Sequence, residues 1–229
     1  MPARYRNRTE AGRRLAARLR DYADREDVII LALPRGGVPV GFEVARALHA
    51  PLDVFVVRKL GLPDHSEYAM GAIASGGVRV IDRETVQRYG VTEAELAAVI
   101  ATEERELDRR ERAYRDGRAF PGIGGQTVIL VDDGLATGAT MAAAASAIRA
   151  QEPAALIVAV PVASVETCDA FRDIVDDIIC ALTPEPFYAV GLWYEDFSQT
   201  TDEEVHDLLA AARHARSARD TDPASPARR

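Results

Sequence analysis

Lysine is almost absent from this chain of 229 residues, because Lys59 is the only lysine among 28 basic residues. Cysteine is also scarce: Cys168 and Cys180 form no CxxC pair, so the sequence predicts neither a disulfide framework nor a zinc site. No apolar run approaches the roughly 20 residues of a membrane-spanning helix. The N-terminal stretch is charged and has no apolar segment, so we expect no secretory signal. These absences favour a cytoplasmic protein without a membrane span.

The overall charge is acidic. A net charge of -8 and a pI near 5.1 argue against a nucleic-acid binder. Arginines nevertheless crowd the first 20 residues, and we interpret this run as a solvated face on a first helix. Hydrophobic residues make up 48% of the chain, which is enough to bury a core.

Short apolar runs alternate with helical patterns between the two ends of the chain. Buried strands are expected at 28–33, 54–57, 127–131, 155–162 and 177–182, with a shorter strand at 78–81. Helices are expected after residue 37 and at 92–116, 139–150 and 164–172. This alternation predicts an α/β fold with a mostly parallel, twisted sheet flanked by helices. The helix at 92–116, which Thr92 and Glu95 would cap, is a long accessory helix.

Two segments fall outside this alternation. Residues 58–77 are rich in glycine and too long for an ordinary connection, so we expect a functional loop there. Residues 215–229 are polar and rich in arginine, which predicts a disordered tail after a single domain at 1–214.

The most informative motif follows the run at 127–131. Asp132 and Asp133 stand at the carboxyl end of this expected strand, and a stretch of glycine, threonine and alanine leads into the next helix. Small residues at a helix N-terminus expose backbone N–H groups that hold phosphate. Carboxylates beside them accept hydrogen bonds from vicinal hydroxyls, so the motif indicates a sugar phosphate. It matches neither the P-loop nor the GxGxxG pattern.

The segment VILVDDGLATGAT resembles the phosphoribosyl diphosphate (PRPP) motif of type I phosphoribosyltransferases, and the resemblance extends over about residues 25–197. It implies a core at about 25–183 followed by a small hood-like segment at about 184–200. It also implies that Asp132 and Asp133 bind the ribose hydroxyls. It implies that Gly134 and Leu135 belong to the PRPP-binding loop, and that the 5-phosphate is held by the residues after them, Ala136, Thr137, Gly138, Ala139 and Thr140, with the two threonine hydroxyls.

Two further elements resemble parts of this family. The loop Pro34–Gly37 corresponds to the diphosphate loop, which often contains a cis peptide bond before a residue other than proline, and implies PRPP-binding roles for Arg35, Gly36 and Gly37. The pair Arg58-Lys59 resembles the VRK element of orotate and adenine phosphoribosyltransferases, which implies PRPP-binding roles for both residues. The loop after this pair would be a mobile lid. Arg35 and Lys59, with Asp132 and Asp133, are the expected catalytic residues.

The acceptor is less well defined. The segment FYAVGLWYEDF resembles the acceptor-binding part of purine salvage enzymes, which implies that Tyr188 stacks on a base, Glu195 accepts from its edge and Trp193 lines the rim. The alternative is that these aromatic residues only cover the core. Ala136 replaces the aspartate that serves as general base in 6-oxopurine enzymes, and Leu62 replaces a lysine of the orotate enzymes. Neither acceptor is therefore favoured.

The resemblance implies a PRPP-dependent phosphoribosyltransferase of nucleotide and nucleoside metabolism. It would move 5-phosphoribosyl to a nitrogen acceptor resembling a nucleobase and release diphosphate. Mg²⁺ would be bound through the diphosphate of PRPP and not directly by the protein. Dimers are usual in the family, and helix 92–116 offers a surface for a homodimer. The alternative is a PRPP-sensing regulatory protein without catalytic activity.

Overall fold

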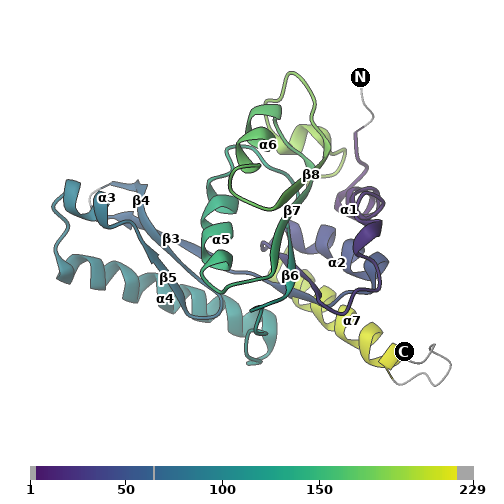
Figure 1. The fold of residues 1–229 in the computed structure, drawn as a ribbon, viewed down its shortest axis with the longest axis horizontal. Coiled ribbons are helices and arrows are strands. Elements are labelled where there is room, and N and C mark those ends of the chain that lie inside the picture. Colours follow the sequence, from purple (N-terminus) through teal and green to yellow (C-terminus); the bar gives the residue numbers. More distant parts are fainter. Residues whose placement is uncertain (1–3, 64, 221–229) are drawn as a thin grey trace.

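A five-stranded sheet forms the centre of the protein in the computed structural model, which describes residues 4–63 and 65–220. Its strands are all parallel and run in the order β2-β1-β6-β7-β8 (Figure 1). They are β1 (Val28–Ala32), β2 (Leu52–Val54), β6 (Thr127–Val131), β7 (Ala155–Val162) and β8 (Asp177–Leu182). The order reverses between β1 and β6, because β1 leads outward to β2 and β6 leads the other way to β7.

Helices cover both faces of this sheet. Alternate side chains of β1 enter different clusters: Val28 and Ile30 face α1, α2 and α7, whereas Ile29 and Leu31 face α5 and α6. These helices are α1 (Arg8–Ala16), α2 (Gly37–Leu48), α5 (Ala139–Arg149), α6 (Val165–Phe171) and α7 (Asp202–Asp220). Figure 1 shows α5 and α2 on opposite sides of the sheet. The predicted α/β fold with a parallel sheet flanked by helices is confirmed.

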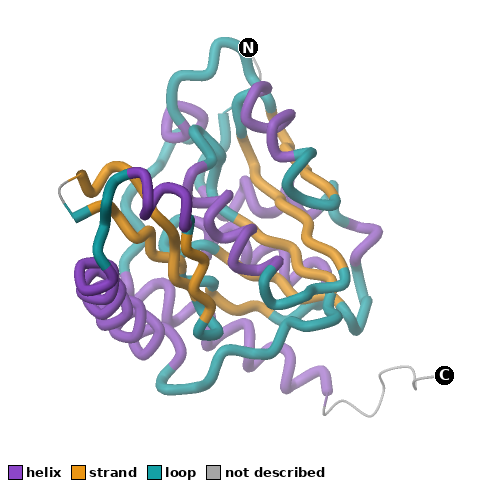
Figure 2. Tube along the Cα trace, turned by 60° about the vertical axis from the view of Figure 1, so that its left-hand side comes forward, coloured by secondary structure: helices purple, strands orange, loops and turns teal. Residues whose placement is uncertain are grey.

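A second sheet replaces the loop that was predicted at 58–77. It contains β3 (Val57–Leu62), β4 (His65–Ala74) and β5 (Val78–Ile81), all antiparallel. α3 (Arg83–Arg88) follows, and α4 (Glu93–Arg115) lies alongside this sheet (Figure 2). The expected free loop is wrong because its glycines lie within or between paired strands, and register shifts beside Gly61 obscure the alternation.

The predicted strand at 54–57 joins the two sheets. Val54 ends β2 and Val57 begins β3, while Phe55 and Val56 between them are fully buried. The N–H of Phe55 donates to the carbonyl of Ala32 at 2.9 Å, so the connection still hydrogen-bonds to the first sheet. The apolar run correctly indicated that these residues are buried, but Phe55 and Val56 lie in the connection between the two sheets and not in a strand.

The helices expected at 92–116, 139–150 and 164–172 begin and end within a residue of those bounds, and α2 ends at Leu48. α4 carries the predicted capping box: the Thr92 hydroxyl accepts from the N–H of Glu95, and the Glu95 carboxylate accepts from the N–H of Thr92. Leu96 and Leu107 of this helix are buried, so it packs against the domain. A short 3-10 helix, η1 (Arg20–Tyr22), precedes β1. None of the helices in the described ranges combines the length and apolar character that crossing a membrane requires.

The C-terminal helix α7 was not expected. Its first residues after 201 are acidic, and its buried side chains, Val205 and Leu209, pack against the cluster formed by α2 and α4. The predicted disordered tail at 215–229 overlaps this helix, because residues 215–220 are helical. Residues 221–229 lie outside the described residues.

Cys168 and Cys180 form a disulfide, which contradicts the expectation from their spacing. Cys168 lies in α6 and Cys180 in β8, next to β7 in the sheet. The short α6 connects β7 to β8 and packs on β8, so the fold brings together two residues that the local sequence leaves apart.

Protonation of His206 is expected to stabilise the docking of α7. His206 contacts Asp207 and, at 2.8 Å, Asp116 at the end of α4. These bonds raise the pKa of His206 above its usual 6.5, so its contribution is present below about pH 6.5 and lost as pH rises through the higher folded-state pKa. We expect His206→Gln to lower the melting temperature more near pH 6 than near pH 9. His214→Gln, on the same helix, is the control, and equal losses at both pH values would contradict this account.

Candidate active site

Two loops leave the sheet side by side at the point where the strand order reverses. Ala32 of β1 pairs with Val131 of β6 in register, and the N–H of Leu33 donates to the Val131 carbonyl at 2.9 Å. The chain after β1 therefore begins next to the chain after β6. α2 takes the first loop to one face of the sheet and α5 takes the second to the other. Open parallel sheets bind their ligands at such a point, and we refer to the region between the two loops as the crevice.

Two neighbouring carboxylates open the second loop. The side chain of Asp132 accepts from the N–H of Asp133 at 2.8 Å, and Arg8 donates through Nε to the Asp133 carboxylate at 2.8 Å. Burial, and then the charge of Asp133, raises the pKa of Asp132 well above its usual range. Burial also raises the pKa of Asp133, and Arg8 opposes this rise. The pair is thus partly buried, and Arg8 is the cation that the described residues place beside it.

The glycines of the first loop allow it to lie against this pair. A Cβ on Gly36 would stand 2.1 Å from Oδ2 of Asp133, and one on Gly37 would stand 2.8 Å from the Val131 carbonyl. Any side chain at either position would collide with the second loop. The Pro34–Arg35 peptide bond is cis. The structure therefore brings Gly36 and Gly37 together with Asp132 and Asp133, and Arg35 precedes them on the same loop.

The remainder of the second loop presents unused donors. Within the described residues, the five backbone N–H groups from Ala136 to Thr140 donate to no acceptor, and the Thr137 and Thr140 side chains are exposed without a partner. Gly138, with φ of +72°, caps α5, so these groups surround a helix N-terminus. Consecutive free N–H groups at such an end form a concave anion site.

Helix α6 supports this loop from behind. The Thr167 hydroxyl donates to the Ala136 carbonyl at 2.6 Å, and a Cβ on Gly138 would stand 2.6 Å from the Phe171 ring. The N–H of Leu135 donates to the Val162 carbonyl at 2.8 Å. These contacts hold the Ala136 carbonyl and the Leu135 N–H in place and use none of the N–H groups from Ala136 to Thr140.

The cations predicted to act on diphosphate have different surroundings. Arg35 is partly exposed and stands 3.8 Å from Asp202 at the start of α7, whose carboxylate also accepts from the Tyr114 hydroxyl. Arg58 faces α4, where its guanidinium makes a salt bridge to Glu103 with distances of 2.7 and 2.6 Å.

Lys59 faces the opposite side of β3 from Arg58, because side chains alternate along a strand. Val57, on the same side, packs in the cluster that contains the buried residues of α5. Lys59 is exposed and has no ion-pair partner among the described residues. Its ammonium is therefore on the side of α5 and free to meet a ligand, whereas Arg58 already has a carboxylate.

The hood segment pairs with the segment that precedes α1. Tyr5 and Tyr194 form a parallel bridge, and the Tyr194 hydroxyl donates to the Asp133 carbonyl at 2.6 Å. Val190, in the 3-10 helix η2 (Val190–Trp193), lies against Gly134, where a Cβ would stand 2.4 Å from it. The hood thus closes directly on the loop that carries the carboxylates.

The three residues expected to bind the acceptor differ in exposure. Tyr188 is 79% exposed and Glu195 is exposed, whereas Trp193 is half-buried against the Tyr5 and Tyr194 cluster. The buried indole Nε1 of Trp193 has no hydrogen-bond partner among the described residues. Their acceptor roles remain predictions.

Arg8 and Tyr194 are the residues of this site that sequence reasoning missed. Arg8 lies in the arginine run interpreted as a solvated face, yet its side chain is only 12% exposed. That interpretation is wrong for Arg8 because its partner is 125 residues away. No local sequence pattern predicts a contact over that separation. Tyr194 lies within the aromatic segment 187–197, which was already a candidate for the acceptor site.

The comparisons with known proteins agree with this geometry. The family model described as "Phosphoribosyl transferase domain" matches residues 4–181. Two Mycobacterium tuberculosis proteins, from strains CDC 1551 / Oshkosh and H37Rv, carry names that assign them provisionally to the phosphoribosyl transferases. Each is 44% identical over 206 residues, which is 90% of this chain and 46% of the relative. The chain therefore spans about half the length of these curated relatives.

A solved structure supports the same fold. The protein TT1426 from Thermus thermophilus is 40% identical, with a TM-score of 0.81 over 91% of this chain and 98% of that one. The family match covers more than half of the chain and includes both loops of the crevice. This chain belongs to the phosphoribosyl transferase domain family.

Proposed function

We propose that this protein binds PRPP in the crevice between β1 and β6 and transfers its 5-phosphoribosyl group to a nitrogen acceptor, releasing diphosphate. The observation that carries this proposal is the buried pair Asp132 and Asp133 beside five free N–H groups. A sugar phosphate needs both parts, because its hydroxyls donate to carboxylates and its phosphate accepts from amides.

The parts of PRPP match the parts of the crevice. The 5-phosphate would accept from the N–H groups of Ala136 to Thr140, with the hydroxyls of Thr137 and Thr140 as further donors. The ribose hydroxyls would donate to Asp132 and Asp133. The diphosphate would lie along Pro34–Gly37, where Gly36 and Gly37 let the backbone approach and Arg35 and Lys59 supply positive charge.

The reaction would depend on positioning and electrostatics. The bond from C1 of the ribose to the diphosphate oxygen breaks and leaves the electron pair on diphosphate, while the nitrogen lone pair of the acceptor forms the new bond to C1. The aspartates stabilise the positive charge that develops on the sugar, and Arg35 and Lys59 stabilise the leaving group. Mg²⁺ would enter with the substrate, bound to the diphosphate oxygens that this hard cation prefers.

The acceptor would lie under the hood. Tyr188 has most of its ring exposed and is available to stack on a planar base, and the Glu195 carboxylate is exposed to accept from its edge. Because Ala136 carries no base, an acceptor that needs no proton removed by the phosphate loop fits best. A nucleobase-like nitrogen compound is the proposed class.

Replacing Lys59 is expected to slow the reaction more than it weakens binding. Lys59→Met removes charge that acts mainly on the departing diphosphate, so the rate should fall by about 100-fold or more while PRPP affinity changes by less than about 10-fold. The measurement is diphosphate release from PRPP and Mg²⁺ with a panel of nucleobases. Arg79→Met is the matched control, because Arg79 lies on the same small sheet and pairs with Glu104.

The assay with the panel of nucleobases also distinguishes a phosphoribosyltransferase from a regulatory protein that only senses PRPP. Release of diphosphate with at least one acceptor would establish the transferase. PRPP binding without release for any acceptor would contradict catalysis and support the PRPP-sensing regulatory protein.

A further inference from the structure

Four parts of the chain that are distant in sequence meet at Arg8. Its Nε donates to Asp133 at 2.8 Å and its Nη1 to the carbonyl of Ser198 at 2.7 Å. Its guanidinium also lies 4.0 Å from the centroid of the Phe197 ring. A Cβ on Gly36 would stand 3.3 Å from the Arg8 Nε. Arg8 thus joins α1 to the diphosphate loop, the carboxylate loop and the hood.

This arrangement separates Arg8 from the other N-terminal arginines. Arg6 is 74% exposed, and Glu10 is its one ion-pair partner in the part of the chain that the structure describes, an i,i+4 contact near the same helix end. Arg8 is almost enclosed, and its partner Asp133 is equally enclosed. A nearly buried ion pair keeps its two side chains in one geometry, whereas an exposed ion pair contributes little to stability or to side-chain position.

We propose that Arg8 is a positioning residue of the PRPP site, which holds the Asp133 carboxylate ionised and oriented for the ribose while it fixes the hood above the loop. This inference rests on the proposed function. Two consequences follow from the contacts. Without a cation, the buried Asp133 beside Asp132 would take up a proton more readily. Without the bonds to Ser198 and Phe197, the hood would lose a link to the loop below it.

The charges around Asp133 define the expected pH dependence. Asp132 lies beside it on the same loop, Arg8 faces it from α1, and the Tyr194 hydroxyl from the hood donates to its backbone carbonyl. Burial raises the pKa of Asp133 and Arg8 opposes this. Asp196, on the hood, also lies within the field of Arg8. Removing Arg8 takes away the largest effect that lowers the pKa of Asp133, so its carboxylate should become protonated at a higher pH than in the wild type.

The test is calorimetric titration of PRPP with Mg²⁺ into the wild type, Arg8→Gln and Arg8→Lys between about pH 6 and pH 8.5. Arg8→Gln should bind about 10-fold more weakly or worse, with a loss that grows as pH falls. Arg8→Lys should keep the wild-type pH dependence because it keeps the charge, yet bind more weakly because it loses the fork to Ser198. Arg6→Gln is the matched control and should bind as the wild type does.

A double variant shows whether Arg8 acts through Asp133. Adding Arg8→Gln to Asp133→Asn should cost less affinity than Arg8→Gln costs in the wild type, since the carboxylate is already gone and only the contacts to Ser198 and Phe197 are still lost. Unchanged affinity in Arg8→Gln at every pH, or tighter binding, would overturn this inference while the wild type still binds PRPP. Absence of binding to the wild type would overturn the proposed function, and this inference with it.

Discussion

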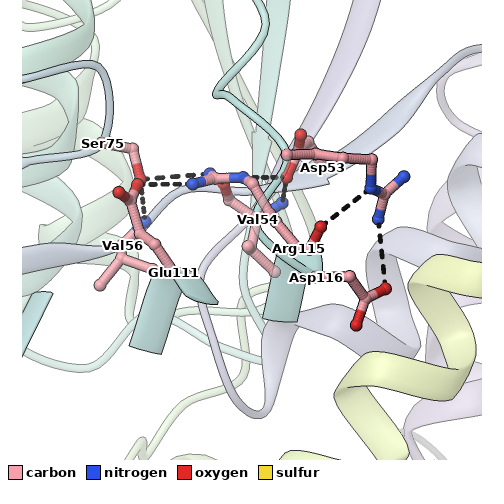
Figure 3. A network of polar contacts seen from close by, with 8 residues as sticks. Asp53, Val54, Val56, Ser75, Glu111, Arg115 and Asp116 are labelled. Carbon is pink, nitrogen blue, oxygen red and sulfur yellow. Dashed lines mark hydrogen bonds and ion pairs between the residues drawn. The ribbon is translucent and has the colours of Figure 1, made fainter. Parts of the chain in front are cut away.

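Replacing Arg115 by methionine is expected to lower the free energy of unfolding by about 3–5 kcal/mol. Arg115, the last residue of α4, is 3% exposed and its guanidinium holds two carboxylates, Asp53 of β2 and Glu111 of α4, at 2.8 and 2.5 Å. It also donates to the carbonyl of Val54 and to the Ser75 hydroxyl (Figure 3). Arg115 therefore connects the long helix to both sheets.

The large loss of stability is expected because Arg115→Met leaves the partners of the guanidinium unpaired. Two poorly exposed carboxylates lose their cation and the Val54 carbonyl loses a donor, whereas the apolar stem is retained. Arg112→Met is the matched control: Arg112 lies one turn earlier, is 77% exposed and stands 3.7 Å from Asp108, so its loss should fall within about 0.5 kcal/mol. Denaturant unfolding of the wild type, Arg115→Met and Arg112→Met measures the two losses of unfolding free energy. A decrease below about 1 kcal/mol for Arg115→Met would contradict this account.

Replacing both aspartates of the crevice is expected to change ligand binding and stability in opposite directions. Asp132→Asn/Asp133→Asn removes the charged acceptors for the ribose hydroxyls, and two charge-assisted hydrogen bonds contribute about 3–6 kcal/mol, so PRPP affinity should fall by at least about 100-fold. Asp173→Asn, at an exposed position, is the control and should bind PRPP as the wild type does.

Asp132→Asn is expected to show that the ionised Asp132 carboxylate lowers the stability of the folded protein. Burial and Asp133 raise the folded-state pKa of Asp132 above its unfolded value, so its ionised form opposes folding at every pH above that unfolded pKa. Asp132→Asn should therefore melt at a higher temperature than the wild type near pH 8, and the difference should disappear in acid, where both states of the wild type are protonated. A lower melting temperature near pH 8 would contradict this explanation.

The central strands β1, β6 and β7 were predictable from the sequence because they are short apolar runs, rich in β-branched residues, that are buried on both faces. The carboxylate loop was predictable for a related reason, since Asp132, Asp133 and the small residues after them are contiguous in the chain. Both features are local, so the pattern of neighbouring residues contains the information.

The second sheet and α7 were not predictable in the same way. β3 and β4 contain Gly61 and Gly71, residues typical of loops, and only pairing with each other and packing against α4 makes them strands. α7 has few apolar residues, and its buried side chains meet helices far away in the sequence. Tertiary contacts decide these elements.

In the site, too, residue types are set by local sequence, whereas the partners of these residues are set by tertiary contacts. Arg8 was predicted to be solvated because its neighbours are other arginines, and its role depends on a carboxylate in a distant loop. Arg58 and Lys59 are adjacent in sequence, yet strand geometry directs one toward Glu103 and the other toward α5. The residue types of the crevice are thus readable from the sequence, and their pairing is not.

Calorimetric titration of PRPP with Mg²⁺ into the wild type and into Asp132→Asn/Asp133→Asn tests the central claim most directly. The claim predicts saturable binding at one site per chain for the wild type and no measurable binding for the variant, with both proteins folded by circular dichroism. Equal binding by the two proteins would contradict the assignment of the ribose to Asp132 and Asp133. No binding by the wild type would contradict the PRPP site itself.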